Sequence, residues 1–113
     1  MIFPRYKHCF IFIAWLCWLN PTFANPLISE FMADNKSSLT DEDGSYSDWI
    51  EIHNPTSAPL SLLGWKLTDS ATNLSKWSFP AITLAPGEFR IFFASEKHLI
   101  YPHHTNFKLS AGG

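Results

Sequence analysis

Apolar and polar residues alternate in short segments along most of this chain, and each segment ends at a turn-forming residue. The segment Asp48–His53 places Ile50 and Ile52 on one face of a strand and a tryptophan, a glutamate and a histidine on the other. Asn54-Pro55 follows directly, and proline ends a strand because it has no N–H to donate to the ladder. The same pattern returns roughly every ten to fifteen residues, which is typical of a small all-β sandwich.

The pattern predicts strands joined by turns and loops, because no segment after residue 24 keeps a helical period over a helical length. We expect residues 89–94, the most apolar segment, to form a central strand that is covered on both faces. Asp34–Ser47 and Ser95–Asn106 are expected to be irregular loops. The predicted strands are Leu27–Ala33, Asp48–His53, Leu63–Thr68, Lys76–Phe79, Phe89–Ala94 and Phe107–Ser110. A sandwich of this class has about seven strands, so we expect residues 25–113 to lack the last strand or strands of their domain.

Large aromatic side chains fall within these strands and supply the apolar surface that a core needs. Each such ring can bury roughly 150–250 Å². We expect the core to be built around Trp49, Trp65, Trp77, Phe79, Phe89, Phe92 and Phe93.

The first 24 residues have the layout of a cleavable secretory signal peptide. Arg5 and Lys7 form a basic start, the apolar run Cys9–Leu19 follows, and small residues precede a predicted cut after Ala24. A membrane anchor is the alternative, but a run of this length spans only about half of a ~30 Å hydrocarbon core as a helix. Lipidation at Cys17 is disfavoured, because the bulky Leu16 stands where lipoprotein signals need a small residue.

Removal of residues 1–24 would leave one modest domain, residues 25–113, outside the cytoplasm: secreted, periplasmic or at the cell surface. Both cysteines lie in the predicted signal peptide, so this domain has no disulfide and no thiol chemistry. Its ten acidic and six basic residues give a net charge of −4. It has no basic stripe, which argues against a nucleic-acid partner and against attraction to anionic lipid.

Six sequence blocks at suitable spacing resemble the lamin tail domain family. They are Leu27–Asn35, Ser47–Asn54, Leu62–Asp69, Trp77–Pro80, Leu84–Glu88 and Leu109–Gly113. The resemblance implies an immunoglobulin-like β-sandwich that binds or tethers and that carries no catalytic residues. Exported members of the family often sit beside hydrolase or spore-coat-kinase-like domains. The family's sandwich continues beyond the position of Gly112-Gly113, where this chain ends.

The acidic loop, which is the polar loop Asp34–Ser47 with the following Asp48, is a candidate calcium site. Asp41, Asp43 and Asp48 could supply carboxylate oxygens, the ligands that calcium prefers, and exported modules commonly bind calcium weakly. An EF-hand loop would need a glutamate at its twelfth position, where this chain has Ile52. The alternative is a solvated acidic loop that binds no metal.

Trp49 is a candidate residue for stacking on a carbohydrate ring, because it shares a strand face with Glu51 and His53. We favour the alternative, in which Trp49 packs under a loop or against the other sheet, because a tryptophan at this place belongs to the family pattern.

The remaining polar residues do not form a recognisable catalytic motif. The sequence has no Gly-x-Ser-x-Gly elbow, no His-Glu-x-x-His and no phosphate-binding glycine loop. A triad assembled in space from distant serine, histidine and acidic residues stays open at this point. His98, His103 and His104 are expected to be exposed loop residues rather than a zinc site, because no cysteine is available and adjacent residues point to opposite sides.

We therefore expect an exported, non-catalytic interaction or tethering module that belongs to a longer cell-surface or secreted protein. Its expected partner is a protein or another cell-envelope component, including a downstream domain of the same protein. The mature form is expected to have no cofactor and no stable membrane span. The alternative is an accessory module that binds calcium or carbohydrate for a larger secreted enzyme.

Overall fold

The computed structural model describes residues 12–15 and 25–109, and every regular element in this part of the chain is a β-strand. The predicted all-β class is therefore confirmed. No described segment forms a helix long and apolar enough to cross a membrane. The strands are β1 (Phe12–Trp15), β2 (Leu27–Met32), β3 (Asp48–His53), β4 (Leu60–Ser61), β5 (Trp65–Thr68), β6 (Trp77–Ser78), β7 (Thr83–Leu84) and β8 (Phe89–Ala94).

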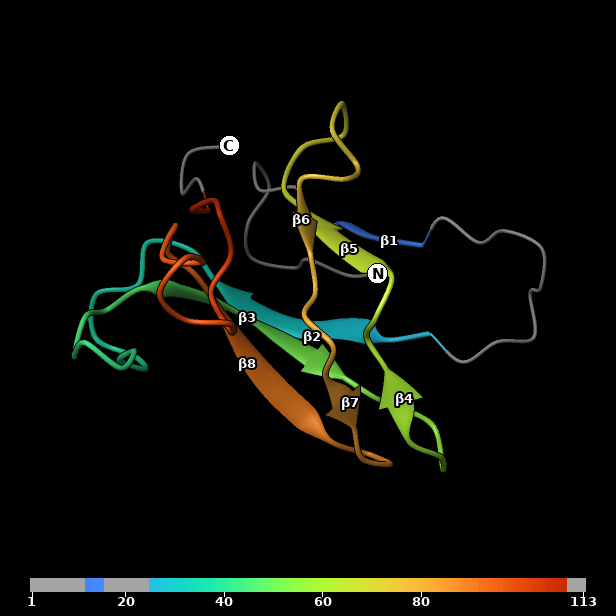
Figure 1. The fold of residues 1–113 in the computed structure, drawn as a ribbon. Helices are drawn as coiled ribbons and strands as arrows, with labels where there is room; N and C mark the ends of the chain where they lie inside the picture. Colours follow the sequence, from blue (N-terminus) through green and yellow to red (C-terminus); the bar gives the residue numbers. More distant parts are fainter. Residues whose placement is uncertain (1–11, 16–24, 110–113) are drawn as a thin grey trace.

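The first layer is an antiparallel sheet in the order β2-β3-β8 (Figure 1). β3 is the central strand, and its whole length is paired with β8, from Asp48 opposite Ala94 to His53 opposite Phe89. Because Ile50 and Ile52 share one face, that face turns inward and both side chains are fully buried.

The second layer consists of short strands (Figure 1). β4 and β5 lie in one segment of the chain, and β6 and β7 lie in the segment beside it. β5 lies between β1 and β6, and β4 pairs with β7. The two pairs are joined by loop hydrogen bonds, from Phe79 N–H to Trp65 O (3.0 Å) and from Leu62 N–H to Ile82 O (2.8 Å). Sequence alternation missed β4 and β7 because two residues are too few to show a period.

The core between the layers is centred on Phe92, which is fully buried. The Phe79 ring meets it edge-on with centroids 5.0 Å apart, and the Trp77 ring lies 6.1 Å away. Such T-shaped pairs are the favoured geometry of aromatic rings. The buried cluster comprises Ile28, Phe31, Ala33, Ile50, Ile52, Leu62, Trp65, Leu67, Trp77, Phe79, Leu84, Phe92, Ala94, Phe107 and Leu109.

The position of β8 and the role of Phe89 differ from the sequence prediction. β8 lies at one side of its sheet rather than in the centre, and among the described residues beyond it His103–Thr105 adds hydrogen bonds at Phe93. Phe89 is 54% exposed and stacks on the His53 ring with centroids 3.8 Å apart. The apolar residues on both faces of this segment therefore did not indicate a central strand, because the outer face of β8 is only partly covered.

A β-bulge in β2 also breaks simple alternation. Ile28 pairs with Ile52 and Glu30 pairs with Glu51, so Ser29 is the extra residue. The shift brings Ile28 and Phe31 to the buried face, although strict alternation separates them. The predicted last strand at 107–110 is reduced to an isolated bridge between Lys108 and Ser95 in the described residues.

β1 lies within the segment that the sequence predicts to be a signal peptide. It pairs antiparallel with β5, from Phe12 opposite Thr68 to Trp15 opposite Trp65. Cleavage after Ala24 stays a prediction, and both cysteines and Gly112-Gly113 lie outside the described residues.

Buried polar side chains close the strand ends and fix the loops that follow. Asn54, fully buried after β3, donates its amide to Ala58 O (2.8 Å), Ala85 O (3.0 Å) and Leu84 O (3.3 Å) and accepts from Thr56 N–H (3.0 Å). These bonds give partners to backbone groups around the end of β3, which lowers the cost of burying them.

Two further residues do the same at other strand ends. Asn35, after β2, donates to Leu39 O (2.8 Å) and Ser47 O (2.9 Å) and so joins both ends of the acidic loop. Thr68, the last residue of β5, donates to Asn73 O (2.7 Å) and accepts from Ser70 N–H (3.0 Å). The loops are therefore closed by side chains rather than by apolar contacts alone.

We predict that Asn54→Ala lowers the free energy of unfolding by about 2 kcal/mol or more, because it removes all the hydrogen bonds of a fully buried side chain, including the one to the buried Leu84 carbonyl. The measurement is urea unfolding followed by tryptophan fluorescence. Asn73→Ala is the matched control, since the Asn73 side chain is exposed, and it should change stability by less than about 0.5 kcal/mol. Equal effects of the two substitutions would contradict this role of Asn54.

Candidate functional site

The acidic loop and the segment after β8 meet at one end of the first layer, although more than fifty residues separate them in the sequence. Asp41 is the centre of this contact. One of its carboxylate oxygens accepts the N–H groups of Asp43 and Ser45, both at 3.0 Å, and the other accepts the Ser47 hydroxyl at 2.6 Å. Gly44, with φ of 75°, provides the left-handed turn that these bonds close.

Lys97 joins the two segments. Its Nζ atom lies 2.7 Å from Asp41 Oδ2 and 3.0 Å from Asp43 Oδ2. Burial by itself would raise the pKa of Asp41, but the hydrogen bonds from Lys97, Ser47 and the loop backbone outweigh it and hold that pKa far below its usual range. The hydrogen bond to Asp41 in turn raises the pKa of Lys97. Both groups are therefore ionised at neutral pH.

Tyr101 adds a second contact between the same segments. Its hydroxyl donates to Asp43 Oδ1 at 2.6 Å. This bond, together with the one from Lys97, lowers the pKa of Asp43, and it raises the pKa of Tyr101. We call Asp41, Asp43, Lys97 and Tyr101 the Asp41 network.

His104 forms a neighbouring chain of polar contacts. Its Nε2 atom lies 2.6 Å from Glu42 Oε2, and its Nδ1 atom lies 2.5 Å from Ser95 Oγ. The ring is fully buried and packs near the Tyr101 and Phe93 rings, with centroid distances of 4.9 and 5.1 Å. A histidine that the sequence places in an exposed loop is thus one of the most buried residues, and that expectation is wrong for His104.

Ser95, His104 and Glu42 are the residue types of a hydrolytic triad, but their setting favours a structural role. A catalytic base must reach the proton of a nucleophile that also contacts substrate. Here the imidazole has no exposed surface, and the Ser95 hydroxyl also accepts the N–H of Lys97 at 3.2 Å. The chain of contacts ties three segments together: the acidic loop, the end of β8 and the loop that follows.

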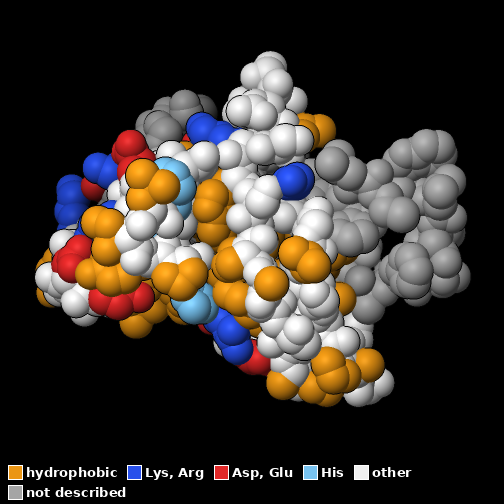
Figure 2. All heavy atoms as spheres, in the orientation of Figure 1, with side chains coloured by type: hydrophobic (Ala, Val, Ile, Leu, Met, Phe, Trp, Pro, Cys, Tyr) orange, Lys and Arg blue, Asp and Glu red, His pale blue; other side chains and the backbone are white. Residues whose placement is uncertain are grey.

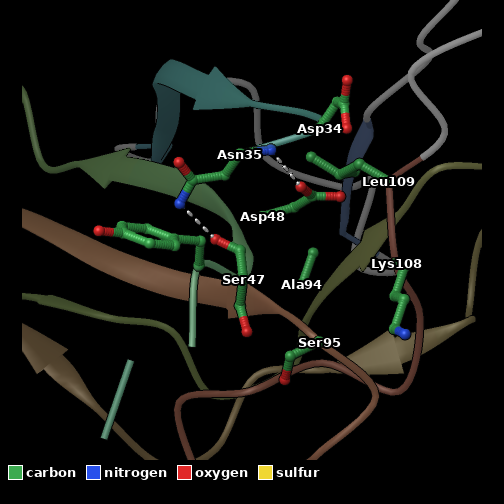
Figure 3. A pocket seen from close by; sticks show the side chains of 9 residues that line it. Asp34, Asn35, Ser47, Asp48, Ala94, Ser95, Lys108 and Leu109 are labelled. Carbon is green, nitrogen blue, oxygen red and sulfur yellow. Dashed lines mark hydrogen bonds between the residues drawn. The ribbon is translucent and has the colours of Figure 1, made fainter. Parts of the chain in front are cut away.

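A polar cavity of about 450 Å³ lies beside this region, and Asp48 faces it (Figure 3). Asp48 accepts the N–H of Asn35 at 3.0 Å. Burial raises the pKa of Asp48, and the nearby Asp34 charge acts in the same direction. The cavity is lined by Asp34, Asn35, Tyr46, Ser47, Asp48, Ala94, Ser95, Lys108 and Leu109.

The structure separates the residues of the candidate calcium site. Asp41 and Asp43 share the Lys97 ammonium, whereas Asp48 faces the cavity and binds the backbone after β2. Within residues 12–15 and 25–109, no three His, Cys, Asp or Glu side chains are grouped to hold a metal ion. A calcium ion would have to displace the ammonium from both carboxylates, because like charges cannot share the site.

Trp49 is only 6% exposed, so it offers no ring face on which a sugar could stack. This burial favours the packed interpretation, and the candidate stacking role stays a prediction. Trp49 lies opposite Met32 and Phe93 on the sheet face away from the main core. Its indole N–H is buried without a hydrogen-bond partner among the described residues.

Sequence reasoning missed the partners of the acidic loop. Lys97, Tyr101 and His104 lie in a loop whose residues show no period, so nothing local links them to Asp41 or Glu42. The one available signal is charge: an acidic loop beside strand ends needs a cation, and the domain has only six basic residues from which to supply it.

A family model described as Lamin Tail Domain matches residues 20–113, which is most of the chain. The chain belongs to the lamin tail domain family. This is an immunoglobulin-like, non-enzymatic domain family, in agreement with the two-layer antiparallel architecture. Neither a curated protein nor a solved structure matches the chain.

We predict that Asp41→Asn in this lamin tail domain lowers the free energy of unfolding at pH 7 by about 2 kcal/mol and flattens its loss in acid. The folded pKa of Asp41 lies below its unfolded value near 4, so its contribution is present above that value and is lost as the pH falls. Urea unfolding between pH 3 and pH 7 measures both effects. Glu30→Gln, on an exposed side chain, should keep the wild-type slope, and an unchanged slope in Asp41→Asn would contradict the assignment.

Calcium should not raise the melting temperature of the domain, because the Lys97 ammonium already binds both loop carboxylates and would repel the ion. A ligand that binds only the folded state must raise apparent stability, so thermal unfolding with and without millimolar calcium decides the point. An increase that disappears in Asp43→Asn would establish the calcium site instead.

Proposed function

We propose that this lamin tail domain is an exported, non-catalytic interaction module that tethers a longer cell-surface or secreted protein to a protein partner in the cell envelope. Membership of a non-enzymatic, immunoglobulin-like family supports the non-catalytic part. The layout of residues 1–24 supports export.

The observation that carries the docking role is the exposure of Leu99 and Ile100. They are 88% and 70% exposed and adjacent in sequence, and they are the two most exposed large apolar side chains among the described residues. We call this pair the tip. A water-exposed apolar pair has no folding benefit in this position, whereas burial in a partner would contribute about 1.5–3 kcal/mol for each side chain.

The tip stands on a loop that is already fixed. The N–H groups of Ile100 and Tyr101 both donate to Lys97 O, at 2.9 and 3.0 Å. Lys97 and Tyr101 themselves are bound to Asp41 and Asp43. A loop held on both sides of its tip loses little conformational entropy when a partner binds, which favours affinity.

Acidic side chains surround the base of this loop. Glu42, Asp43 and Glu96 come from the two joined segments, and each carboxylate-bearing side chain is about half exposed. Figure 2 shows apolar side chains next to acidic and basic ones on the side of the molecule that carries the loop. The arrangement fits an apolar pocket with basic residues at its rim, since complementary charge speeds association and selects the partner.

The accessory-module alternative has less support. Its carbohydrate form depended on Trp49, which is buried, and its calcium form depends on two carboxylates that already bind the Lys97 ammonium. The tip needs neither ligand.

We predict that the double substitution Leu99→Ser and Ile100→Ser weakens binding of the purified protein to isolated cell envelopes at least about tenfold, because two buried apolar contacts are lost. The measurement is a sedimentation binding curve, followed by identification of the partner with a photo-crosslinker at position 99 and titration of the purified partner.

Leu63→Ser is the matched control, because Leu63 is 62% exposed but lies far from the tip in the chain, before β5. It should leave the binding curve unchanged, and circular dichroism should show all variants folded. Equal loss in Leu63→Ser, or full binding by the tip variant, would contradict the proposal.

N-terminal sequencing of the exported product should begin at Asn25.

A further inference from the structure

The loop between β5 and β6, residues 69–76, projects past the strands that it joins (Figure 1). Residues 71–75 are all exposed, and residues 70–75 carry no charged side chain. The loop contains Asn73-Leu74-Ser75, which matches the Asn-x-Ser/Thr acceptor motif for an N-linked sugar. A sugar is bulky and belongs on the surface, so the fold decides whether this motif can carry one.

The backbone at Asn73 is fixed, whereas its side-chain amide makes no contact that a sugar would break. The Thr68 hydroxyl donates to Asn73 O at 2.7 Å, and the Asn73 N–H donates to Ser70 O at 3.3 Å. The Asn73 amide side chain itself has no hydrogen-bond partner within residues 12–15 and 25–109. A sugar on Asn73 Nδ2 would therefore leave the hydrogen bonds of the loop in place. The site needs no open strand edge and no cavity.

A second Asn-x-Ser motif, Asn35-Lys36-Ser37, has the opposite setting. Asn35 is only 8% exposed, and its amide nitrogen donates to Leu39 O at 2.8 Å and to Ser47 O at 2.9 Å. Its amide oxygen accepts the Ser38 N–H at 2.9 Å. A sugar on this nitrogen would remove one of the two donors that close the acidic loop and would have to occupy a buried position. The fold thus accommodates a sugar at one motif and excludes it at the other.

We propose that Asn73 is the N-glycan acceptor of the exported protein and that Asn35 stays unmodified in the folded product. The inference rests on the export in the proposed function, because N-glycosylation takes place on secreted chains. It concerns a different loop from the tip, and the substitutions that test the tip leave both motifs intact.

The sugar donor is an oligosaccharide linked to a lipid pyrophosphate, and an oligosaccharyltransferase brings it to the acceptor. Asn73 Nδ2 forms a bond to the anomeric carbon of the first sugar and loses one proton. The bond from that carbon to the pyrophosphate oxygen breaks, and the lipid pyrophosphate leaves with the electron pair. The Ser75 hydroxyl completes the motif that the transferase recognises.

The test uses the full chain with its own residues 1–24, secreted by animal cells that attach N-linked sugars. The protein from the medium should be heavier than its sequence mass, and peptide N-glycosidase should remove the difference. Because this enzyme converts the modified asparagine to aspartate, peptide mass spectrometry locates the site. Trypsin cuts after Lys36, Lys66 and Lys76, so the aspartate should appear in peptide 67–76 and not in peptide 25–36. The protein isolated from its native cells should give the same result.

Ser75→Ala and Ser75→Thr form a matched pair. Both change an exposed side chain that has no hydrogen-bond partner in the described part of the chain, but only alanine destroys the motif. Ser75→Ala should abolish the mass difference, as should Asn73→Gln, whereas Ser75→Thr should retain it. Circular dichroism should show all three variants folded.

Three results would overturn the inference. A native exported product with unmodified Asn73 would exclude the site. A mass difference that persists in Asn73→Gln or Ser75→Ala would assign the sugar to another residue. An aspartate in peptide 25–36 of folded protein would show that Asn35 is an acceptor.

A version with a foreign secretion leader in place of residues 1–24 separates this inference from the export that it shares with the proposed function. A sugar that is attached only with the foreign leader would support Asn73 as an acceptor and contradict export by residues 1–24. Secretion of both versions without a sugar would overturn the Asn73 site and leave the export intact.

Discussion

Hydrogen bonds from buried polar side chains to loop backbone are the interaction on which this small sandwich depends. Its strands are short, so much of the backbone near the core lies outside the ladders and needs other partners. Asn35, Asn54 and Thr68 supply them at the ends of β2, β3 and β5. An unpaired buried amide or carbonyl is costly, so these side chains determine which loop conformations are compatible with a closed core.

Hydrogen bonds from a buried side chain to loop backbone, here from a charged one, also support the tip that we propose as the docking surface. The Asp41 carboxylate accepts hydrogen bonds from the backbone of the acidic loop and so fixes its conformation. Lys97 binds the same carboxylate and thereby fixes the loop after β8 against it. A charge buried at this depth requires a partner of opposite sign, which explains why the two segments are held together so closely. The exposed pair Leu99 and Ile100 is positioned by groups that themselves serve the stability of the fold.

Local alternation was sufficient to predict the class of fold and the bounds of β3 and β8, because both strands are long enough to show a period of two. It failed at β2, where the bulge at Ser29 shifts the pattern, and at the two-residue strands β4 and β7. It also failed to separate a central strand from a lateral one, as Phe89 shows. The candidate site was the least predictable part, since the contacts of Lys97, Tyr101 and His104 with the acidic loop join segments that are brought together only by the finished fold.

The contacts that link the loop after β8 to the acidic loop affect how the domain would bear a pulling force. A force applied near Leu99 would enter the fold along the chain into β8 and also through Lys97 to Asp41, and from there through Ser45 and Ser47 to Asp48, the first residue of β3. β3 is bonded along its length to strands on both sides, so the load would be shared by many hydrogen bonds in shear rather than by a single strand at the margin. A domain with the tethering role that we propose would gain resistance to pulling from such a route.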